Sequence, residues 1–300
     1  MVGVDRETPG KDRGEMNDGV PGKTVAHRAS DGKGGICEPC SLDPCTAGSR
    51  EPILRLVDVE KTIDGRKVLD GANLEIPRGQ ITAIIGLSGA GKSLLLKHMI
   101  GLMKPDRGQV LLDGVDINRL SRQGLYEARK RFGMLFQTGA LFDSLTVFEN
   151  VAFPLREKTG MAEGEIREKV RRILRHVGLE EAEEKFPDEL SGGMVRRAAL
   201  ARAVVMDPEI LLFDEPTTGL DPIIRNSIFN LICRTYHEEH FTMVMISHDI
   251  PDIFHWCHHV VVVHNGKVVE VGNPSEIQNS VNPFVRQLVE GDISGPVRIM

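Results

Sequence analysis

Two kinds of hydrophobic pattern follow one another along the chain from residue 53 onward, and together they predict an α/β fold. Apolar and polar residues alternate over 54–59 and 72–76, as on strands with one face in the core. Apolar runs at 210–213 and 242–246 suit the centre of a parallel sheet, where strands are buried on both faces. Further short strands are predicted over 81–85, 110–112 and 134–136.

Helical patterns separate these strands. They predict helices over 92–102, 163–177 and 191–206, the last two with arginine and glutamate on their outer faces. Most of 138–190 has helical character, so we expect a helical subdomain there. Near the end of the chain, Asn265-Gly266 lies between two apolar runs and predicts a β-hairpin.

Composition divides the chain into three parts. Residues 1–51 contain no aromatic residue and few large apolar ones, so they are predicted to be a disordered tail. Cys37, Cys40 and Cys45 lie in this tail without a fourth ligand at a convincing spacing for zinc, which favours incidental thiols over a metal or redox site. Residues 52–276 form the predicted globular domain, and 277–300 a C-terminal helix and tail.

Charge and hydropathy exclude several function classes. The net charge of −6 and pI of about 6.0 provide no basic footprint, so we expect no nucleic-acid partner. No apolar run approaches the ~18 residues of a membrane span, and the first residues lack the apolar core of a signal peptide. We therefore expect a soluble, cytoplasmic protein.

A glycine-rich loop provides the first candidate chemistry. It follows the predicted strand 81–85, opens the predicted helix 92–102 and fits G-x-x-x-x-G-K-[ST]. Its residues are Gly86, Leu87, Ser88, Gly89, Ala90, Gly91, Lys92 and Ser93. Glycines let successive N–H groups approach phosphate at a helix N-terminus, the lysine reaches the outer phosphates, and the hydroxyl binds Mg²⁺. The pattern predicts a site for ATP and Mg²⁺.

A pair of carboxylates completes the expected chemistry. Asp214 and Glu215 end the apolar run 210–213, and a strand tip can hold Asp214 rigidly near Mg²⁺ or its water. Glu215 would then polarise an attacking water. In isolation the pair could equally be a strand running into an acidic loop, but with the phosphate loop it indicates phosphoryl transfer.

Four further motifs give the chain a family resemblance. The run 190–194, Leu-Ser-Gly-Gly-Met, resembles the signature of the ATP-binding cassette (ABC) ATPases, and the resemblance covers nearly all of 53–275. Gln137 matches the Q-loop, Asp221 the D-loop and His248 the switch histidine. The resemblance implies a P-loop α/β core of ABC type, with an antiparallel β subdomain and a helical subdomain.

The resemblance also implies a role for each motif. Lys92 and the loop backbone would hold the phosphates, Ser93, Gln137 and Asp214 would hold Mg²⁺, Glu215 would be the base, and His248 would contact the γ-phosphate. Ser191, Gly192, Gly193 and Asp221 would serve the site of a second copy, so two chains would enclose two ATP molecules.

Two positions depart from the family pattern. The region upstream of the phosphate loop, where the family usually stacks an aromatic residue on adenine, contains Ile63 and no aromatic residue, so apolar contact would replace stacking there. The signature ends in Met194 where glutamine is usual.

A narrower resemblance accounts for Met194. The stretches 132–142, 150–157 and 190–203 look like those of the Mla/Mce-type phospholipid transport ATPases. The resemblance implies a multi-spanning permease, an Mce-domain substrate-binding protein and a STAS-domain regulator as partners, at the cytoplasmic face of the inner membrane. The alternatives are an importer of a small polar solute and a non-transport ABC protein; the latter usually carries two cassettes or a coiled-coil insertion.

The C-terminal segment carries a separate prediction. Apolar residues at 284, 285, 288 and 289 mark one face of a short helix that Gly291 can end. The apolar piece 297–300 follows. It either folds back on its own domain or, as the resemblance favours, clasps the second copy.

Overall fold

The computed structural model describes residues 51–239 and 241–297. The expected disordered tail lies outside this part of the chain, apart from Glu51, and so do Cys37, Cys40 and Cys45. Within the described residues no helix combines the length and the hydrophobicity needed to cross a bilayer.

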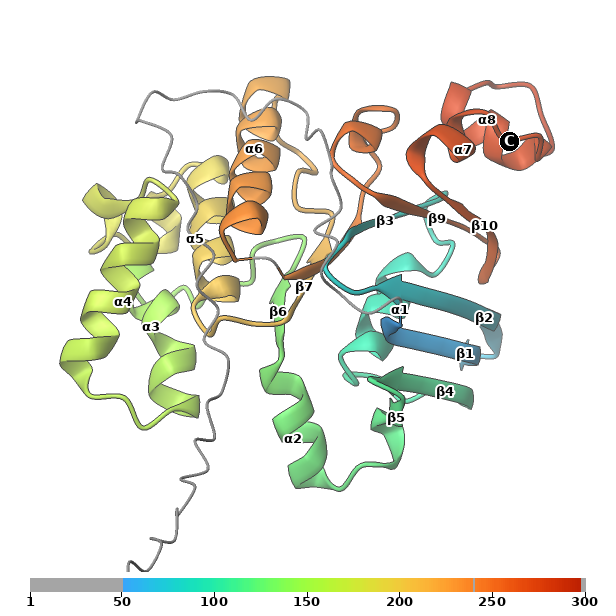
Figure 1. Cartoon of the computed structure of the whole chain (residues 1–300). Coiled ribbons are helices and arrows are strands. Elements are labelled where there is room, and N and C mark those ends of the chain that lie inside the picture. The colour runs from blue at the N-terminus through green and yellow to red at the C-terminus, as the bar shows by residue number, and fades with distance from the viewer. Residues whose placement is uncertain (1–50, 240, 298–300) are drawn as a thin grey trace, which may run out of the picture. The chain divides into compact units, whose positions relative to one another are not determined.

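A six-stranded sheet forms the centre of the domain (Figure 1), in the order β10-β9-β3-β8-β7-β6. Five of its strands run parallel, and β10 pairs antiparallel with β9 at one edge. The strands are β3 (Ile81–Ile85), β6 (Phe132–Leu135), β7 (Ile210–Asp214), β8 (Thr242–Ile246), β9 (His259–His264) and β10 (Lys267–Gly272). Asp214 is thus the last residue of a central strand, as the sequence predicts.

Alternate residues of the central strands enter two separate cores. In β7, Leu211 and Phe213 join the core on one side, while Ile210 and Leu212 join the core on the other. β3 and β8 divide their side chains in the same way. Burial on both faces explains why these strands read as apolar runs without alternation.

A four-stranded antiparallel sheet, in the order β2-β1-β4-β5, lies beyond α1 (Lys92–Met99). Its strands are β1 (Pro52–Ile63), β2 (Arg66–Pro77), β4 (Arg107–Leu112) and β5 (Val115–Asp116). Side chains of β1, β2 and α1 share one core with the inner face of the six-stranded sheet. This sheet is the antiparallel β subdomain expected from the family resemblance.

Helices cover the other face of the six-stranded sheet. α3 (Val147–Lys158) and α4 (Glu163–His176) supply the helices predicted for 138–190, and with α5 (Gly192–Val204) and α6 (Pro222–Glu239) they enclose the larger core. α2 (Arg122–Lys130) precedes β6. The predicted helix 92–102 ends earlier, at Met99, because Gly101 takes a left-handed turn with φ +68°.

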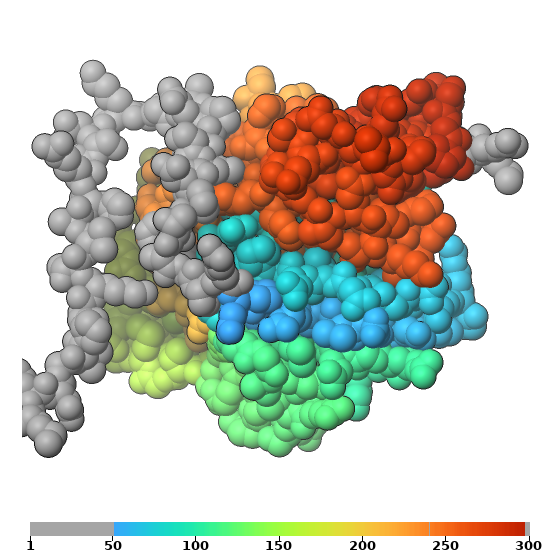
Figure 2. All heavy atoms as spheres, turned by 45° about the vertical axis from the view of Figure 1, so that its right-hand side comes forward, coloured from blue at the N-terminus to red at the C-terminus, as the bar shows by residue number. Residues whose placement is uncertain are grey.

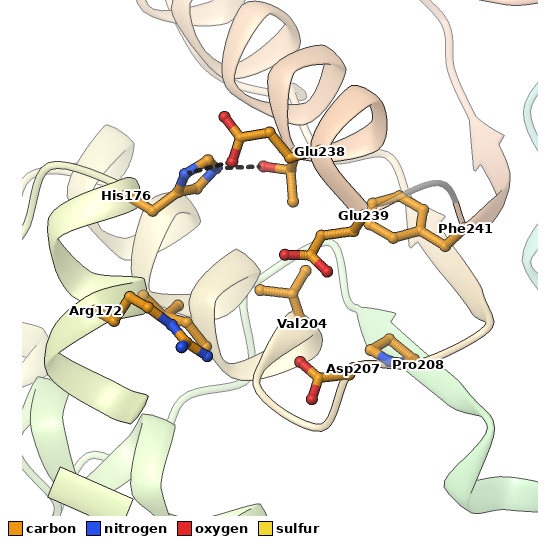
Figure 3. Close-up of a pocket in the computed structure, with 10 residues that line it drawn as sticks. Arg172, His176, Val204, Asp207, Pro208, Glu238, Glu239 and Phe241 are labelled. Carbon is orange, nitrogen blue, oxygen red and sulfur yellow. Dashed lines mark hydrogen bonds and ion pairs between the residues drawn. The ribbon is translucent and has the colours of Figure 1, made fainter. Parts of the chain in front are cut away.

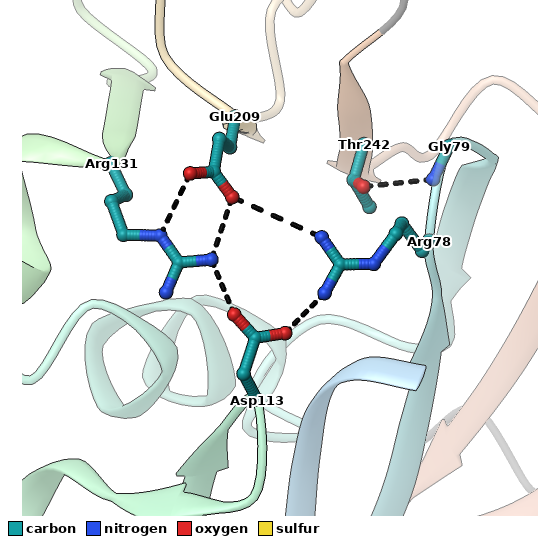
Figure 4. A network of polar contacts seen from close by, with 6 residues as sticks. All are labelled: Arg78, Gly79, Asp113, Arg131, Glu209 and Thr242. Atoms are coloured by element: carbon teal, nitrogen blue, oxygen red, sulfur yellow. Dashed lines mark hydrogen bonds and ion pairs between the residues drawn. The ribbon is translucent and has the colours of Figure 1, made fainter. Parts of the chain in front are cut away.

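A ring of four charged side chains joins the two sheets (Figure 4). Arg131 contacts Glu209 through two nitrogens, at 3.1 and 2.6 Å, and also contacts Asp113. Arg78 closes the ring by contacting Asp113 and, at 3.9 Å, Glu209. Glu209 directly precedes β7, so the ring lies at the end of that strand opposite Asp214.

The C-terminal segments pack on both sheets. The β9–β10 turn meets β2, where the Asp70 N–H donates to the Gly266 carbonyl at 3.0 Å. Figure 2 shows the orange and red C-terminal residues lying directly on the blue and cyan ones. After α7 (Pro274–Gln278) and α8 (Pro283–Glu290), Gly291 ends the helix with φ +68°. The Gln287 side chain then bonds both backbone groups of Val297, at 2.9 Å each.

Candidate nucleotide-binding and catalytic site

The phosphate loop runs from the end of β3 to the first turn of α1, and its backbone shape depends on glycine. Gly86, at φ +150°, passes so close to β9 that an added Cβ would lie 2.1 Å from the Val263 carbonyl oxygen. Gly91 adopts φ +100° as the residue that precedes α1. The loop therefore presents unobstructed N–H groups at a helix N-terminus, the arrangement that accepts phosphate.

Lys92 lies beneath this loop with its charge directed at it. The side chain is 5% exposed, and its Nζ donates to the carbonyls of Gly86 and Leu87, both at 2.8 Å. Burial lowers the pKa of Lys92, and the nearby carboxylates of Glu215 and Asp214 act in the opposite direction. A buried ammonium group held by neutral carbonyls is well placed to bind an anion.

Ser93 and Asp214 form a pair suited to a hard cation. The Ser93 hydroxyl donates to Asp214 Oδ1 at 2.9 Å. Burial raises the pKa of Asp214, and the hydrogen bond from Ser93 opposes this. A hydroxyl and a carboxylate are oxygen ligands of the kind that Mg²⁺ takes alongside phosphate oxygens. In the described part of the chain no group of three or more His, Cys, Asp or Glu could hold a metal.

Glu215 is the centre of a polar cluster. Its carboxylate accepts from Gln137 Nε2 at 3.0 Å and from the Thr218 hydroxyl at 3.0 Å, and lies 2.7 Å from His248 Nε2. The backbone of Glu215 has φ +51°, which is uncommon for a residue with a side chain. Three residues expected at the site, Gln137, Glu215 and His248, therefore meet although they lie far apart in sequence.

The signature and D-loop residues form a second group. Ser191 begins α5, its hydroxyl accepting from the Met194 N–H at 3.4 Å, and Asp221 accepts from the N–H groups of Ile223 and Ile224 at the start of α6. An added Cβ on Gly193 would lie 2.9 Å from Ile224 Cγ2, so glycine lets the two helix starts pack closely.

Most residues of this second group lie at the protein surface. Ser191, Gly192 and Asp221 are exposed, and within the described residues no hydrogen bond joins them to the phosphate loop. Ile63 is 37% exposed at the end of β1 and offers apolar surface; its contact with a base stays a prediction.

Sequence reasoning missed two threonines and their partners. Thr218 contacts the Glu215 carboxylate directly, and Thr217, 3% exposed, donates to Asp249 at 2.6 Å. Asp249 also accepts from Arg225 Nη1 at 3.2 Å. Two hydroxyls directly after Glu215-Pro216 and a carboxylate directly after His248 are the signals that could have indicated this link.

Comparisons with known proteins agree with this geometry. Residues 69–218 match the family described as ABC transporter. The intermembrane phospholipid transport system ATP-binding protein MlaF of Haemophilus influenzae is 46% identical over 78% of this chain and 88% of its own length. The chain belongs to the ABC transporter family. A probable ribonucleotide transport ATP-binding protein, mkl, of Mycobacterium leprae is 41% identical over 79% of this chain and 68% of its own length.

A solved structure extends the agreement to the fold of this ABC cassette. The ATP-binding cassette MJ0796, a dimer in a post-hydrolysis state with ADP and Pi, superposes with a TM-score of 0.68 at 31% identity, covering 74% of this chain and 98% of that one. The chain is an ABC-type ATPase. Such cassettes bind ATP, generally with Mg²⁺, dimerise, and work with a membrane permease.

Proposed function

We propose that this ATPase powers the movement of phospholipid between membranes through a separate permease. The observation that carries the proposal is the 46% identity to a phospholipid transport subunit over 88% of that protein's length. The name of the mkl relative supports a second candidate, in which the ATPase drives transport of a small polar solute such as a ribonucleotide.

The contacts at the site support a separate role in ATP hydrolysis for each of its residues. ATP and Mg²⁺ would supply a polarised γ-phosphorus when bound. Lys92 and the loop N–H groups would bind the phosphates, while Ser93, Asp214 and Gln137 would hold the metal. Glu215, whose carboxylate is positioned by Thr218 and His248, would accept the proton of the attacking water, and His248 would also contact the γ-phosphate.

The same geometry supports a shared site between two copies. Ser191, Gly192 and Asp221 are exposed at helix starts, and in the described chain no hydrogen bond joins them to their own phosphate loop; Gly193 is buried where these helix starts pack together. We therefore expect the isolated chain to be a poor ATPase, and a permease that binds two copies to raise its rate through effective concentration. Hydrolysis by an isolated monomer at a fast, concentration-independent specific rate would contradict this.

An apolar groove beside Gln137 is our candidate for the permease contact. The groove has a volume of about 310 Å³, and its lining includes Phe136, Phe142, Phe153 and Arg202. Phe142 and Phe153 are 45% and 38% exposed, with ring centroids 4.9 Å apart. Arg202 fixes one wall by donating to the carbonyls of Gly139 and Ala140, at 2.9 and 2.8 Å. A short amphipathic helix of the permease fits such a groove.

Paired variants test the groove. Phe142→Ala should weaken binding of the permease without changing the nucleotide affinity of the single chain, because it removes exposed apolar surface away from the phosphate loop. Phe186→Ala is the matched control, since Phe186 is 42% exposed but does not line the groove. Equal loss of binding by both variants would remove the groove from the proposal.

The permease, the Mce-domain protein and the STAS-domain regulator complete the proposed assembly at the cytoplasmic face of the inner membrane. The C-terminal clasp also belongs to the proposal. In the single chain Val297 is held by Gln287, so clasping would require the last residues to extend from this contact. Deleting 292–300 should weaken assembly while leaving nucleotide affinity intact, and unchanged assembly would refute the clasp.

Reconstitution decides between the two candidate substrates. The ATPase would be copurified with its permease, placed in proteoliposomes, and assayed for transfer of labelled phospholipid and for uptake of labelled ribonucleotide. We expect ATP-dependent phospholipid transfer that Lys92→Ala abolishes, because that variant loses the buried phosphate counter-charge. Ribonucleotide uptake without phospholipid transfer would establish the second candidate instead.

A further inference from the structure

A second concave site lies away from the phosphate loop, where three helices meet. It is a pocket of about 360 Å³ formed by the end of α4, the first turns of α5 and the middle of α6. Arg175, Arg197 and Arg234 line it, one from each helix, with Ser227 and Asn230 between them. No acidic residue lines this arginine pocket.

The charges of these three arginines are not compensated within the described chain. Arginines elsewhere in the described chain do form ion pairs, for example Arg171 with Glu183 at 2.8 Å. Arg175, Arg197 and Arg234 make none with any described residue, and Arg197 has only a long contact of 3.5 Å to the Val177 carbonyl. Three converging cations in one concavity raise the local positive potential and attract an anion.

His176 lines both this pocket and a neighbouring hollow that contains three carboxylates. Its Nε2 lies 3.0 Å from the Thr235 hydroxyl and its Nδ1 lies 3.2 Å from Glu238 Oε2, so both ring nitrogens are engaged by α6 (Figure 3). Beyond it lies a hollow of about 200 Å³ that contains Asp207, Glu238 and Glu239. Arg172 also lines this hollow, whereas the arginine pocket has no acidic lining residue, so an anion is drawn to the arginine pocket.

We propose that the arginine pocket binds a phosphate-bearing anion. A guanidinium group presents planar pairs of N–H donors that match phosphate oxygens, and a tetrahedral phosphate can accept from several directions at once. The volume falls within the usual range of small-ligand sites, roughly 300–1,000 Å³, and leaves room for a group attached to the phosphate. The phosphate belongs either to a soluble phosphorylated compound or to a phospholipid headgroup.

Binding at this pocket would act on the ATPase through its helices. One anion contacting all three arginines would bridge α4 of the helical subdomain, α5 behind Ser191 and α6 behind Asp221. It would stabilise the relative position of the two helices whose starts face the second copy. This inference does not depend on which substrate the transporter moves.

The experiment must separate this pocket from the phosphate loop, which also binds phosphate. Inorganic pyrophosphate would be titrated by calorimetry into the full chain saturated with Mg-ADP, so that the phosphate loop is filled. In a second arm, flotation would measure binding to phosphatidylcholine vesicles with and without phosphatidylglycerol. Both arms would compare wild type with Arg175→Gln and Arg234→Gln, two exposed positions whose replacement should not disturb folding. Arg172→Gln is the matched control, because Arg172 lies on the same helix but lines the hollow on the other side of His176.

Each outcome is decisive. Loss of one charged contact should weaken pyrophosphate binding by roughly tenfold or more in Arg175→Gln and Arg234→Gln but not in Arg172→Gln. That result establishes a site for soluble phosphate compounds. Binding that depends on the two arginines and occurs only with phosphatidylglycerol establishes a headgroup site. No arginine-dependent binding in either arm, or an equal loss in Arg172→Gln, would overturn the proposal and leave the transport function untouched.

Discussion

Asp249, next to His248, connects this histidine to the turn after Glu215, and its replacement gives a quantitative test of the proposed catalytic cluster. Its carboxylate accepts from the Thr217 hydroxyl at 2.6 Å and from Arg225 at 3.2 Å. It therefore fixes the residue next to His248 both to the turn after Glu215 and to α6. Asp249→Ala removes both contacts, whereas Asp249→Asn keeps an oxygen for the threonine and loses only the charge.

The structure sets the size of the effect. Thr217 is 3% exposed, so its hydroxyl would be left without an acceptor, at a cost of about 1–3 kcal/mol. Arg225 keeps Asp252 at 2.8 Å, so loss of the partly exposed ion pair adds at most about 1 kcal/mol. Asp249→Ala should therefore lower the free energy of unfolding by roughly 1–4 kcal/mol and Tm by about 2–4 °C for each kcal/mol. Asp249→Asn should lower it by about 1 kcal/mol or less.

The kcat for ATP hydrolysis should likewise fall more in Asp249→Ala than in Asp249→Asn. A displaced His248 loses its 2.7 Å contact with Glu215, and misplacement on this scale costs roughly ten- to a hundredfold in kcat. KM for ATP should change little, because Lys92 and the loop N–H groups, which are expected to hold most of the phosphate charge, do not contact Asp249, Thr217 or Arg225 in the described chain. Calorimetric melting and steady-state hydrolysis by the permease complex measure the two effects. A wild-type Tm and kcat in Asp249→Ala, or equal damage by the asparagine variant, would refute the reasoning.

Three further predictions concern other parts of the chain. Glu215→Gln should retain ATP binding and slow hydrolysis by about 10²–10⁴-fold, and near wild-type turnover in the permease complex would exclude Glu215 as the base. Burial, with His237 nearby, lowers the pKa of His258 from 6.5 to about 4. Between these two pH values the unfolded chain binds more protons than the folded chain, so the free energy of unfolding falls as the pH drops from 6.5 to 4. The variant His258→Asn keeps an acceptor for the Ile81 N–H. Between pH 7 and 5 its free energy of unfolding, measured with denaturant, should fall by about 2 kcal/mol less than that of wild type. The same pH dependence of the unfolding free energy in both proteins would contradict this. Arg131→Ala should lower the free energy of unfolding by about 1–2 kcal/mol, because it breaks the ring with Glu209, and by less in high salt. The control is Lys130→Ala, which should lower it by about 0.5 kcal/mol or less, since the only ion pair of Lys130 in the described chain is with Glu127. Equal losses would show that the ring does not stabilise the fold.

The parts of the fold that depend on local pattern could be predicted from the sequence. The apolar run before Asp214 becomes a central strand because both of its faces are buried, and α8 covers the predicted residues because Gly291 ends it. The strand predicted at 72–76 is longer, Arg66–Pro77, because pairing with β1 extends it through residues that lack a clear alternation.

Features that join distant segments could not be predicted in this way. The motifs indicate that Gln137, Glu215 and His248 belong to one site, but no spacing indicates that Thr218 shares the carboxylate with them. The arginine pocket is similar, because Arg175, Arg197 and Arg234 come from three helices and each alone resembles an ordinary solvated side chain. Their proximity arises from helix packing, which a single sequence does not display.

The left-handed backbone of Glu215, with φ +51°, has a consequence for the evolution and engineering of this ATPase. A non-glycine residue in this conformation costs of order 1 kcal/mol, and glycine would relieve that cost. Selection for thermal stability alone would therefore favour removing the side chain that we propose as the base of hydrolysis. The strained glutamate is a position where stability and turnover pull in opposite directions, and a stabilised library should be filtered by activity before it is ranked by melting temperature.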